Sequence, residues 1–270
     1  MYSRPKKSLG QNFLTSIPAR MAIVATGEIT PNDIVLEIGP GKGFLTKALL
    51  ETGAHVIALE KDRDLLPLLT ENFSSEIATG NLSIFEGDVL ACNPGDLHLT
   101  PGAYKLIANI PYYITGAILS HFLTHTCAPS VMVVLVQKEV AERVCARDGK
   151  ESLLSLSVKA YGEPKLVYRV NKGSFFPIPS VDSAVLHIKN ISKRNFINTH
   201  HEELFFKLIH AGFAHKRKFA LSNIQSVFCG IDIPSLFEEA GLSPKIRAED
   251  VTLSSWIRIS SRLSSNTVTP

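Results

Sequence analysis

The chain has 270 residues, a mass of 29.5 kDa and 45% hydrophobic residues, enough for one full α/β domain and a smaller second domain. This length and composition exclude a peptide-sized or disulfide-held fold. No run of about 18 apolar residues is available to span a bilayer, and no apolar stretch follows the basic N-terminus as in a secretory signal. The four cysteines are widely spaced and form no C-x-x-C pair, which favours a reducing, cytoplasmic location and indicates no metal site.

The charge is distributed unevenly along the chain. The net charge is only +3, with a pI near 8.6, which by itself does not indicate a nucleic-acid-binding protein. The first 20 residues contain four cations and no acid, residues 21–188 contain 13 basic and 18 acidic residues, and residues 189–270 contain 11 and 7. Basic ends around an acidic middle fit a polyanionic partner, although ordinary solvated Lys and Arg side chains give the same pattern.

Short apolar runs alternate with amphipathic stretches over residues 34–138, which is typical of βαβ units and a mostly parallel sheet. The predicted strands are Ile34–Ile38, His55–Glu60, Leu82–Glu86, Tyr104–Asn109 and Val131–Gln137. The predicted helices between them are 44–50, 62–73 with Asp62 as its cap, and 115–124. Such a sheet binds ligands at the carboxyl ends of its strands, so we look for site residues there.

The pattern changes after residue 138. We predict helices at 139–145 and 152–161, then strands at 166–170 and 181–188 around the proline-rich turn 175–180. The polar stretch 190–199 predicts a linker, and the helices predicted beyond it are 204–213, 216–227, 234–240 and 249–259, with the last eight residues frayed. The predicted domains are therefore residues 1–190, an α/β domain, and residues 191–270, a small all-helical domain.

A glycine-rich loop follows the first predicted strand, with the sequence Glu37-Ile38-Gly39-Pro40-Gly41-Lys42-Gly43. Glycines let the main chain approach a ligand closely. Their spacing does not fit the G-x-G-x-x-G dinucleotide fingerprint or a Walker loop. The pattern E-x-G-x-G-x-G resembles motif I of the S-adenosylmethionine methyltransferases, which makes Gly39 and Gly41 candidate cofactor contacts. A tight strand-to-helix turn without a ligand is the alternative.

Two carboxylates end the next two strands. Glu60 ends the second strand, where an acidic side chain can accept hydrogen bonds from both ribose hydroxyls of a nucleoside. Asp88 follows the third strand, and its carboxylate can accept the amino group of adenine. The alternatives are a helix-capping Glu and a turn Asp that bonds its own backbone. Together with the glycine loop, both residues predict a nucleoside cofactor.

The fourth strand ends in Asn109-Ile110-Pro111-Tyr112, which resembles the (N/D/S)-x-P-(Y/F) motif of amino-methyltransferases. The adenine amino nitrogen is a poor nucleophile because its lone pair is delocalised into the ring. If the Asn109 side-chain oxygen and the Ile110 or Pro111 carbonyl accept its two N–H bonds, the lone pair can face the methyl donor. Pro111 restricts the preceding residue, and Tyr112 is expected to stack on a base presented out of its helix.

Taken together, these motifs resemble the rRNA adenine N6-dimethyltransferases that act on the small ribosomal subunit, along nearly the whole chain. The resemblance implies a Rossmann-like S-adenosylmethionine (SAM) methyltransferase fold that dimethylates two adjacent adenines near the 3′ end of 16S rRNA. Nothing in the sequence requires more than a monomer, and we expect no metal. The N-terminal segment Lys7-Ser8-Leu9-Gly10-Gln11-Asn12-Phe13-Leu14 matches the family's K-x-L-G-Q-N/H-F-L. By that match Asn12 and Leu14 join Gly39, Glu60, Asp88 and Asn109 as cofactor contacts.

Two further family elements concern the RNA. The segment from Phe175 to Ala184 resembles F-x-P-x-P-x-V-D-S-A, which implies that Phe175 stacks on the target base opposite Tyr112; buried packing is the alternative. The segment Phe213-Ala214-His215-Lys216-Arg217-Lys218 resembles F-x-x-R-R-K. Its cations Lys216, Arg217 and Lys218, predicted to open a helix, are expected to contact rRNA phosphates, and a solvated helix end is the alternative.

The chain departs from the family pattern at two places. Tyr113 and Gly116 stand where Asn and Ser or Thr are usual, and after Lys218 the residues Ala220 and Ser222 replace Leu and Asn. Two other functions remain open from the sequence. One is a related enzyme that dimethylates large-subunit rRNA, which the Phe213–Lys218 segment disfavours. The other is a binding protein or assembly checkpoint without catalysis, which intact Glu60 and Asn109 disfavour.

Overall fold

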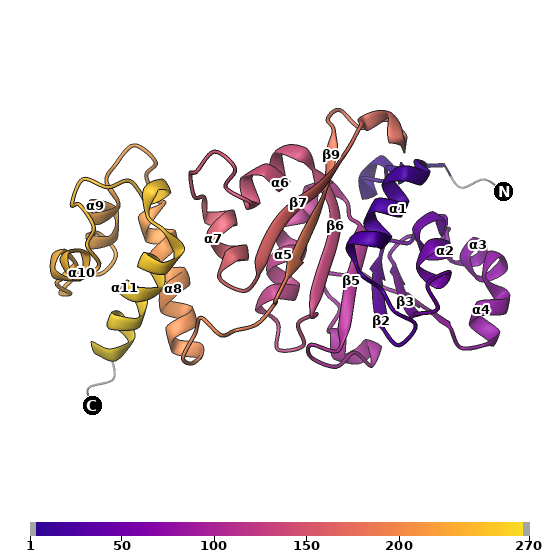
Figure 1. Cartoon of the computed structure of the whole chain (residues 1–270), viewed down its shortest axis with the longest axis horizontal. Helices are drawn as coiled ribbons and strands as arrows, with labels where there is room; N and C mark the ends of the chain where they lie inside the picture. The colour runs from indigo at the N-terminus through magenta and orange to yellow at the C-terminus, as the bar shows by residue number, and fades with distance from the viewer. Residues whose placement is uncertain (1–3, 267–270) are drawn as a thin grey trace. The chain divides into compact units, whose positions relative to one another are not determined.

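The computed structural model describes residues 4–266 and divides into two compact units (Figure 1). The first unit comprises the chain up to Ala141 together with Gly162–Ile191, and the second comprises Glu142–Tyr161 together with the chain from Ser192. The chain passes into the second unit for the last time between Ile191 and Ser192; the first domain predicted from the sequence ends at residue 190. The segment 142–161 was predicted in the first domain, but it clusters with the second unit.

Contacts of the segment 142–161 explain this difference. Lys150 Nζ pairs with the carboxylate of Asp250. The Tyr161 hydroxyl donates a hydrogen bond of 2.5 Å to Glu202 Oε1, and helix α7 (Leu153–Lys159) packs against α8 (Thr199–Gly212). These partners lie far apart in the sequence. Local sequence patterns do not reveal such contacts, so the prediction placed the segment in the same domain as its neighbours in the chain.

A seven-stranded sheet forms the framework of the first unit, in the order β4-β3-β2-β5-β6-β9-β7. The strands are β2 Ile34–Ile38, β3 His55–Glu60, β4 Leu82–Glu86, β5 Tyr104–Asn109, β6 Val131–Gln137, β7 Glu163–Val170 and β9 Ser183–Lys189. Strands β2 to β6 are parallel, and β9 lies antiparallel between β6 and β7. The five strands predicted over residues 34–137 are confirmed with their predicted bounds. The apolar runs of four of them are buried in the sheet, whereas in the edge strand β4 only Leu82 is buried.

A separate two-stranded antiparallel sheet pairs β1 (Phe13–Leu14) with β8 (Phe175–Phe176). The described helices are α1 Ile17–Thr26, α2 Phe44–Leu50, α3 Leu66–Asn72, α4 Ser74–Ala78, α5 Thr115–Thr124, α6 Lys138–Val144, α7, α8, α9 Ala220–Gln225, α10 Ile233–Glu239 and α11 Leu253–Asn266. None of them is long and apolar enough to cross a membrane. Helix α1 is missing from the sequence prediction, although its capping residue Ser16 and the proline in its first turn are start signals.

Several predicted helices differ in their bounds. The helix predicted at 204–213 begins earlier, at Thr199, and ends at Gly212. The helix predicted at 62–73 begins only at Leu66, because the Asp62 carboxylate is bonded to the N-terminal segment and caps no helix. The helix predicted at 216–227 begins only at Ala220, so the basic triplet lies in the preceding turn. Helix α11 continues through Asn266 instead of ending at 259; the remainder of the predicted frayed end lies outside the described residues.

The strand order reverses at β2, whose neighbours are β3 on one side and β5 on the other. At such a point the connections leave in opposite directions, and a crevice opens beyond the carboxyl ends of the strands. The residues that end these three strands are Ile38, Glu60 and Asn109. Their surroundings form the candidate site.

In the second unit, a buried amide holds the end of α8 against α9. Asn223 is 1% exposed, and its Nδ2 donates to the carbonyls of Gly212 at 2.8 Å and His215 at 3.1 Å. Trp256, also fully buried, lies against Gly212, where a Cβ would come within 2.5 Å of the indole. The turn that contains Lys216, Arg217 and Lys218 is therefore held at its start by the hydrogen bonds of Asn223.

We expect Asn223→Ala to destabilise the second unit by about 1–3 kcal/mol, because two carbonyls lose a buried donor. The chain has a single Trp, so urea unfolding followed by Trp256 fluorescence reports on this unit. Gln225→Ala, at an exposed position of the same helix, is the control and should shift stability by less than about 0.5 kcal/mol. Equal midpoints for the two variants would contradict the role of Asn223.

Candidate active site

The loop after β2 contains glycines with left-handed backbone. Gly39 has φ 66° and Gly41 has φ 62°, a region that side-chain-bearing residues rarely adopt. A Cβ at Gly39 would meet nothing within 4 Å, whereas one at Gly41 would come within 3.0 Å of the Phe13 ring. The loop thus presents bare main chain to a cavity that both glycines line, as close approach of a ligand requires.

Glu60 ends β3 and is only 5% exposed. Its Oε2 accepts the N–H of Gly41 at 3.0 Å, and its Oε1 accepts the N–H of Asp62 at 2.8 Å. Burial raises the pKa of Glu60, and the two N–H donors oppose that rise. Each carboxylate oxygen can accept a further hydrogen bond, so Glu60 combines a fixed position with capacity for the hydroxyls of a bound sugar.

Glu37 lies at the end of β2, completely buried in the sheet, and no described residue hydrogen-bonds its Oε2. Burial raises the pKa of Glu37 to about 8, and the nearby charge of Glu60 adds to this rise. The carboxyl is therefore mostly neutral at pH 7. The sequence counts Glu37 among the acidic residues of the middle segment, but its burial removes most of that charge.

Asp88 follows β4 at the same edge of the sheet. Its Oδ2 pairs with Lys61 Nζ at 2.7 Å, and its Oδ1 accepts the N–H of Leu90 at 3.1 Å. The hydrogen bond from Lys61 lowers the pKa of Asp88, which keeps the carboxylate ionised and able to accept. The bond to Leu90 is the local turn contact that was the structural alternative for this residue, and it leaves Asp88 on the cavity wall.

Asn109 ends β5 with its amide oriented by a long-range contact. Its Nδ2 donates to the main-chain carbonyl of Asn12 at 3.0 Å, so Oδ1 is the amide atom left to accept. The following Pro111 has φ −61° and ψ 131°. The Pro111 carbonyl already accepts the N–H of Ile114 at 3.3 Å, which makes the Ile110 carbonyl the better second acceptor.

Tyr112 opens a single 3₁₀ turn, Tyr112–Ile114, directly after the proline. Its hydroxyl lies 2.6 Å from Ser183 Oγ on β9, and burial raises the pKa of Tyr112. The ring is half-buried beside Asn109. A phenol held at its far end keeps the ring in one orientation, as a stacking platform requires.

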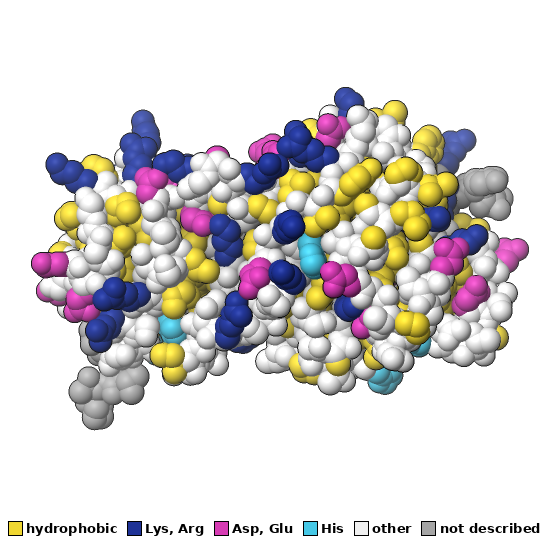
Figure 2. Space-filling model, viewed as in Figure 1, with side chains coloured by type: hydrophobic (Ala, Val, Ile, Leu, Met, Phe, Trp, Pro, Cys, Tyr) yellow, Lys and Arg dark blue, Asp and Glu magenta, His cyan; other side chains and the backbone are white. Residues whose placement is uncertain are grey.

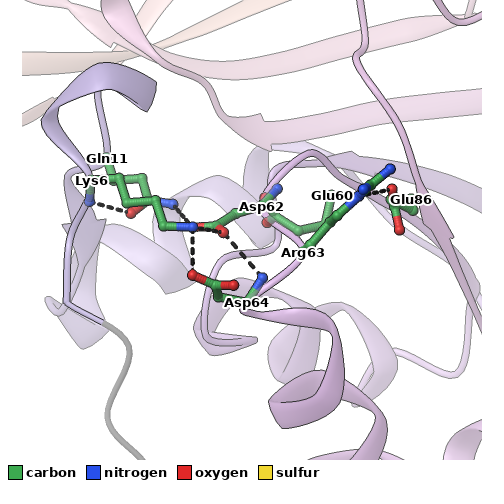
Figure 3. A network of polar contacts seen from close by, with 7 residues as sticks. All are labelled: Lys6, Gln11, Glu60, Asp62, Arg63, Asp64 and Glu86. Atoms are coloured by element: carbon green, nitrogen blue, oxygen red, sulfur yellow. Dashed lines mark hydrogen bonds and ion pairs between the residues drawn. The ribbon is translucent and has the colours of Figure 1, made fainter.

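The N-terminal segment crosses the site and is anchored at both ends, and Figure 3 shows the anchor at Asp62. Lys6 Nζ pairs with Asp62 Oδ1 at 2.5 Å and with Asp64 Oδ2 at 2.7 Å, and Gln11 Nε2 donates to Asp62 Oδ2 at 2.7 Å. At its other end the segment forms β1, which pairs with β8. These contacts join residues far apart in the sequence, and no local pattern in the sequence predicts them.

Two cavities meet this segment. The first has a volume of about 260 Å³, and the second, of about 770 Å³, lies along the glycine loop. The first is lined by nine of the predicted site residues: Asn12, Gly39, Gly41, Glu60, Asp88, Asn109, Ile110, Pro111 and Tyr112. Leu14 lines only the second cavity, which also contains Gly39, Gly41 and Asn109.

The structure does not place Phe175 as the sequence predicts. Phe175 is 2% exposed and packs in the hydrophobic core, whereas Phe176 is 60% exposed and lines the second cavity together with Asn109. Neighbouring residues of a strand point to opposite sides, so within β8 only one of the two rings can face outward. The exposed ring that could contact a base is Phe176. Phe175 is a core residue, in agreement with buried packing, the alternative given for it from the sequence.

Lys216, Arg217 and Lys218 are all exposed in the turn between α8 and α9. The prediction that they open a helix is wrong, because α9 begins at Ala220. On the face shown in Figure 2, Lys and Arg side chains are scattered over this unit, with some Asp and Glu side chains among them. A turn projects its side chains in several directions, which suits contacts with more than one phosphate.

Comparisons with known proteins identify the family that this chain resembles. A sequence model of the ribosomal RNA adenine dimethylase family matches residues 2–265. The chain is 41% identical over 259 residues to the ribosomal RNA small subunit methyltransferase A of Dehalococcoides mccartyi, covering 95% of this chain and 87% of that protein. It is 38% identical over 267 residues to the protein of the same name from Lactiplantibacillus plantarum, covering 96% and 90%.

Two solved structures share the fold over 94% of this chain. A dimethyladenosine transferase from Plasmodium falciparum superposes with a TM-score of 0.81 at 23% identity and is covered over 98% of its length. The 23S rRNA methyltransferase ErmE superposes with a TM-score of 0.75 at 24% identity and is covered completely, at 100%. Both confirm the Rossmann-like methyltransferase fold predicted for the first domain. With a family model that matches almost the whole chain and relatives well above 30% identity, this protein belongs to the ribosomal RNA adenine dimethylase family.

Proposed function

We propose that the protein transfers methyl groups from S-adenosyl-L-methionine to N6 of two adjacent adenines in a loop near the 3′ end of 16S rRNA, two methyls on each base. The substrate is the small ribosomal subunit or its precursor, and the enzyme works in the cytoplasm as a monomer without a metal. Family membership supports the reaction. The single observation that supports the chemistry is the amide of Asn109: its Nδ2 donates to Asn12, and no described residue donates to its Oδ1.

The first cavity fits the nucleoside part of the cofactor. The Glu60 carboxylate, fixed by two N–H groups, would accept the ribose hydroxyls, and the ionised Asp88 would accept the adenine amino group. The open backbone at Gly39 leaves room for the rest of the molecule, and Asn12 completes the wall. When bound, S-adenosylmethionine supplies an electrophilic methyl group on its sulfonium sulfur.

The protein's own residues prepare the adenine nitrogen. Asn109 Oδ1 and the Ile110 carbonyl accept the two N–H bonds of the amino group, which draws the lone pair out of conjugation and toward the methyl group. Because Asn109 Nδ2 is committed to Asn12, the amide cannot turn its donor toward the amine. The transfer would break the S–CH3 bond as the N6–CH3 bond forms and would release S-adenosylhomocysteine. The methylated N6, then positively charged, would lose its proton to water, so no general base with an adjusted pKa is needed.

The target base is held between rings from two elements. Tyr112, with its hydroxyl held by Ser183, stacks on one face, and the exposed Phe176 covers the base from the β8 side. Base–aromatic stacking stabilises a splayed-out base by about 1–3 kcal/mol. This offsets part of the cost of taking the adenine out of its own stack.

The proposed reaction is tested by incubating the protein with methyl-labelled S-adenosylmethionine and 30S particles that lack the modification. We expect label in N6,N6-dimethyladenine of the small-subunit rRNA and none in large-subunit rRNA. Label in the large-subunit strand would support the alternative enzyme. Binding of particles without any labelled dimethyladenine would support the checkpoint function instead.

We expect Asn109→Ala to lower turnover by about 100-fold or more, because the amino group loses the hydrogen bond to Oδ1 that stabilises the transition state. Binding of S-adenosylmethionine and of particles should change little, as measured by calorimetry and filter binding. Asn81→Ala, at an exposed asparagine before β4, is the control with normal turnover. Normal turnover by Asn109→Ala would remove Asn109 from the proposed reaction.

Lys216, Arg217 and Lys218 should contribute electrostatic affinity for rRNA. Replacing all three by Gln is expected to reduce the slope of log affinity against log salt by about 2, since each phosphate contact adds roughly 0.7–0.9. Filter binding between 50 mM and 1 M salt measures this slope, and wild type and variant should converge at the high-salt end, where screening removes the difference. Parallel salt dependences for wild type and variant would mean that the triplet contacts no phosphate.

A further inference from the structure

Tyr113 is a large aromatic residue left at the surface next to the methyl-transfer motif. It is 63% exposed, and it follows Tyr112 in the same 3₁₀ turn. Where Tyr112 is tied to Ser183, Tyr113 borders the first cavity with the outer part of its ring in solvent. The reaction proposed above gives it no role.

The inner side of the Tyr113 ring lies on Gly10 of the N-terminal segment. A Cβ at Gly10 would come within 2.9 Å of both Cδ1 and Cε1 of the ring, so a side chain at residue 10 would have to displace the ring. Gly10 also has φ 62°, a left-handed backbone that favours glycine. The absence of a side chain at residue 10 therefore lets the ring lie directly on the main chain of the segment that crosses the cavity.

The residues around this contact belong to the nucleoside end of the cavity. Gly10 and Tyr113 line it together with Glu60, Lys61 and Asp88. Lys61 Nζ pairs with Asp88 at 2.7 Å, and this pairing raises the pKa of Lys61, to which the Tyr113 phenol adds a smaller contribution. Tyr113 thus lies near the carboxylate assigned to the adenine amino group.

The segment beneath the ring is held in place at a nearby point. Gln11, the residue after Gly10, donates to Asp62, which also pairs with Lys6 (Figure 3). The Gly10 N–H donates to the Lys7 carbonyl at 3.0 Å and completes the short turn. The ring therefore rests on a fixed support, and a flat apolar ligand entering the cavity would bury ring surface that is now exposed.

We propose that Tyr113 is a further cofactor-binding residue: seated on Gly10, its ring closes the cavity over the adenine end of S-adenosylmethionine and slows release of the cofactor. This inference rests on the proposed use of S-adenosylmethionine. Burial of the exposed ring surface by the adenine supplies the stabilisation, because aromatic surface removed from water favours the closed complex. The ring is needed and the hydroxyl is not.

The test is the exchange rate of bound labelled S-adenosylmethionine against excess unlabelled cofactor, together with kcat and KM on 30S particles. We expect Tyr113→Ala to release cofactor about 10-fold faster and to raise KM for S-adenosylmethionine by a similar factor, with kcat at saturating cofactor unchanged, since tenfold corresponds to the loss of one well-packed aromatic contact. Tyr113→Phe should behave as wild type. Tyr168→Ala, a partly exposed tyrosine on β7, is the control.

A double variant tests whether the ring acts through Gly10. Gly10→Ala should also speed release, and its effect should be smaller when Tyr113 is already Ala, because the displaced contact is then absent. Unchanged exchange for Tyr113→Ala would overturn the inference, as would a drop in kcat with normal exchange, which would assign the ring to the RNA. A wild-type protein that binds no S-adenosylmethionine would instead overturn the proposed function.

Discussion

The hydrogen bond from Asn109 Nδ2 to the carbonyl of Asn12 determines how the rest of the site can work. An amide has one donor side and one acceptor side, and only the acceptor side is useful toward an adenine amino group. By committing the donor to a main-chain carbonyl, the fold leaves the oxygen for the substrate. The catalytic loop therefore depends on the N-terminal segment, which lies 97 residues away in the sequence.

That dependence explains why the N-terminal segment is anchored so firmly. The carboxylate of Asp62 receives both Lys6 and Gln11 (Figure 3), and the pairing of β1 with β8 holds the segment at the other side of the cavity. Two or three hydrogen bonds to a buried carboxylate stabilise an arrangement that an exposed ion pair would not. The same residues that tether the segment also bring Gly10 beneath Tyr113.

The charges of the site are arranged by burial. Glu37, deep in the sheet, has its pKa raised to about 8 and is mostly neutral at pH 7, while Glu60 is held by two backbone donors and Asp88 is kept ionised by Lys61. A neutral Glu37 spares Glu60 a close negative neighbour in the low-dielectric interior. The buried Glu60 and the partly exposed, ionised Asp88 thus line the cavity, where they can accept hydrogen bonds from the hydroxyl and amino groups of a nucleoside.

Much of this protein was determined by its sequence. Local patterns predicted five parallel strands with their bounds and, because parallel strands end at one edge, the grouping of Gly39, Glu60, Asp88 and Asn109. Tertiary structure decided what depends on distant partners. Residues 142–161 belong to the second unit. Asp62 binds the N-terminal segment and does not cap a helix. In β8 the exposed ring is Phe176, and Phe175 is buried. The tertiary structure also raised the pKa of Glu37 by burial and brought the ring of Tyr113 onto Gly10. Burial and long-range contacts of this kind cannot be predicted from local sequence patterns, because they depend on residues far away in the chain.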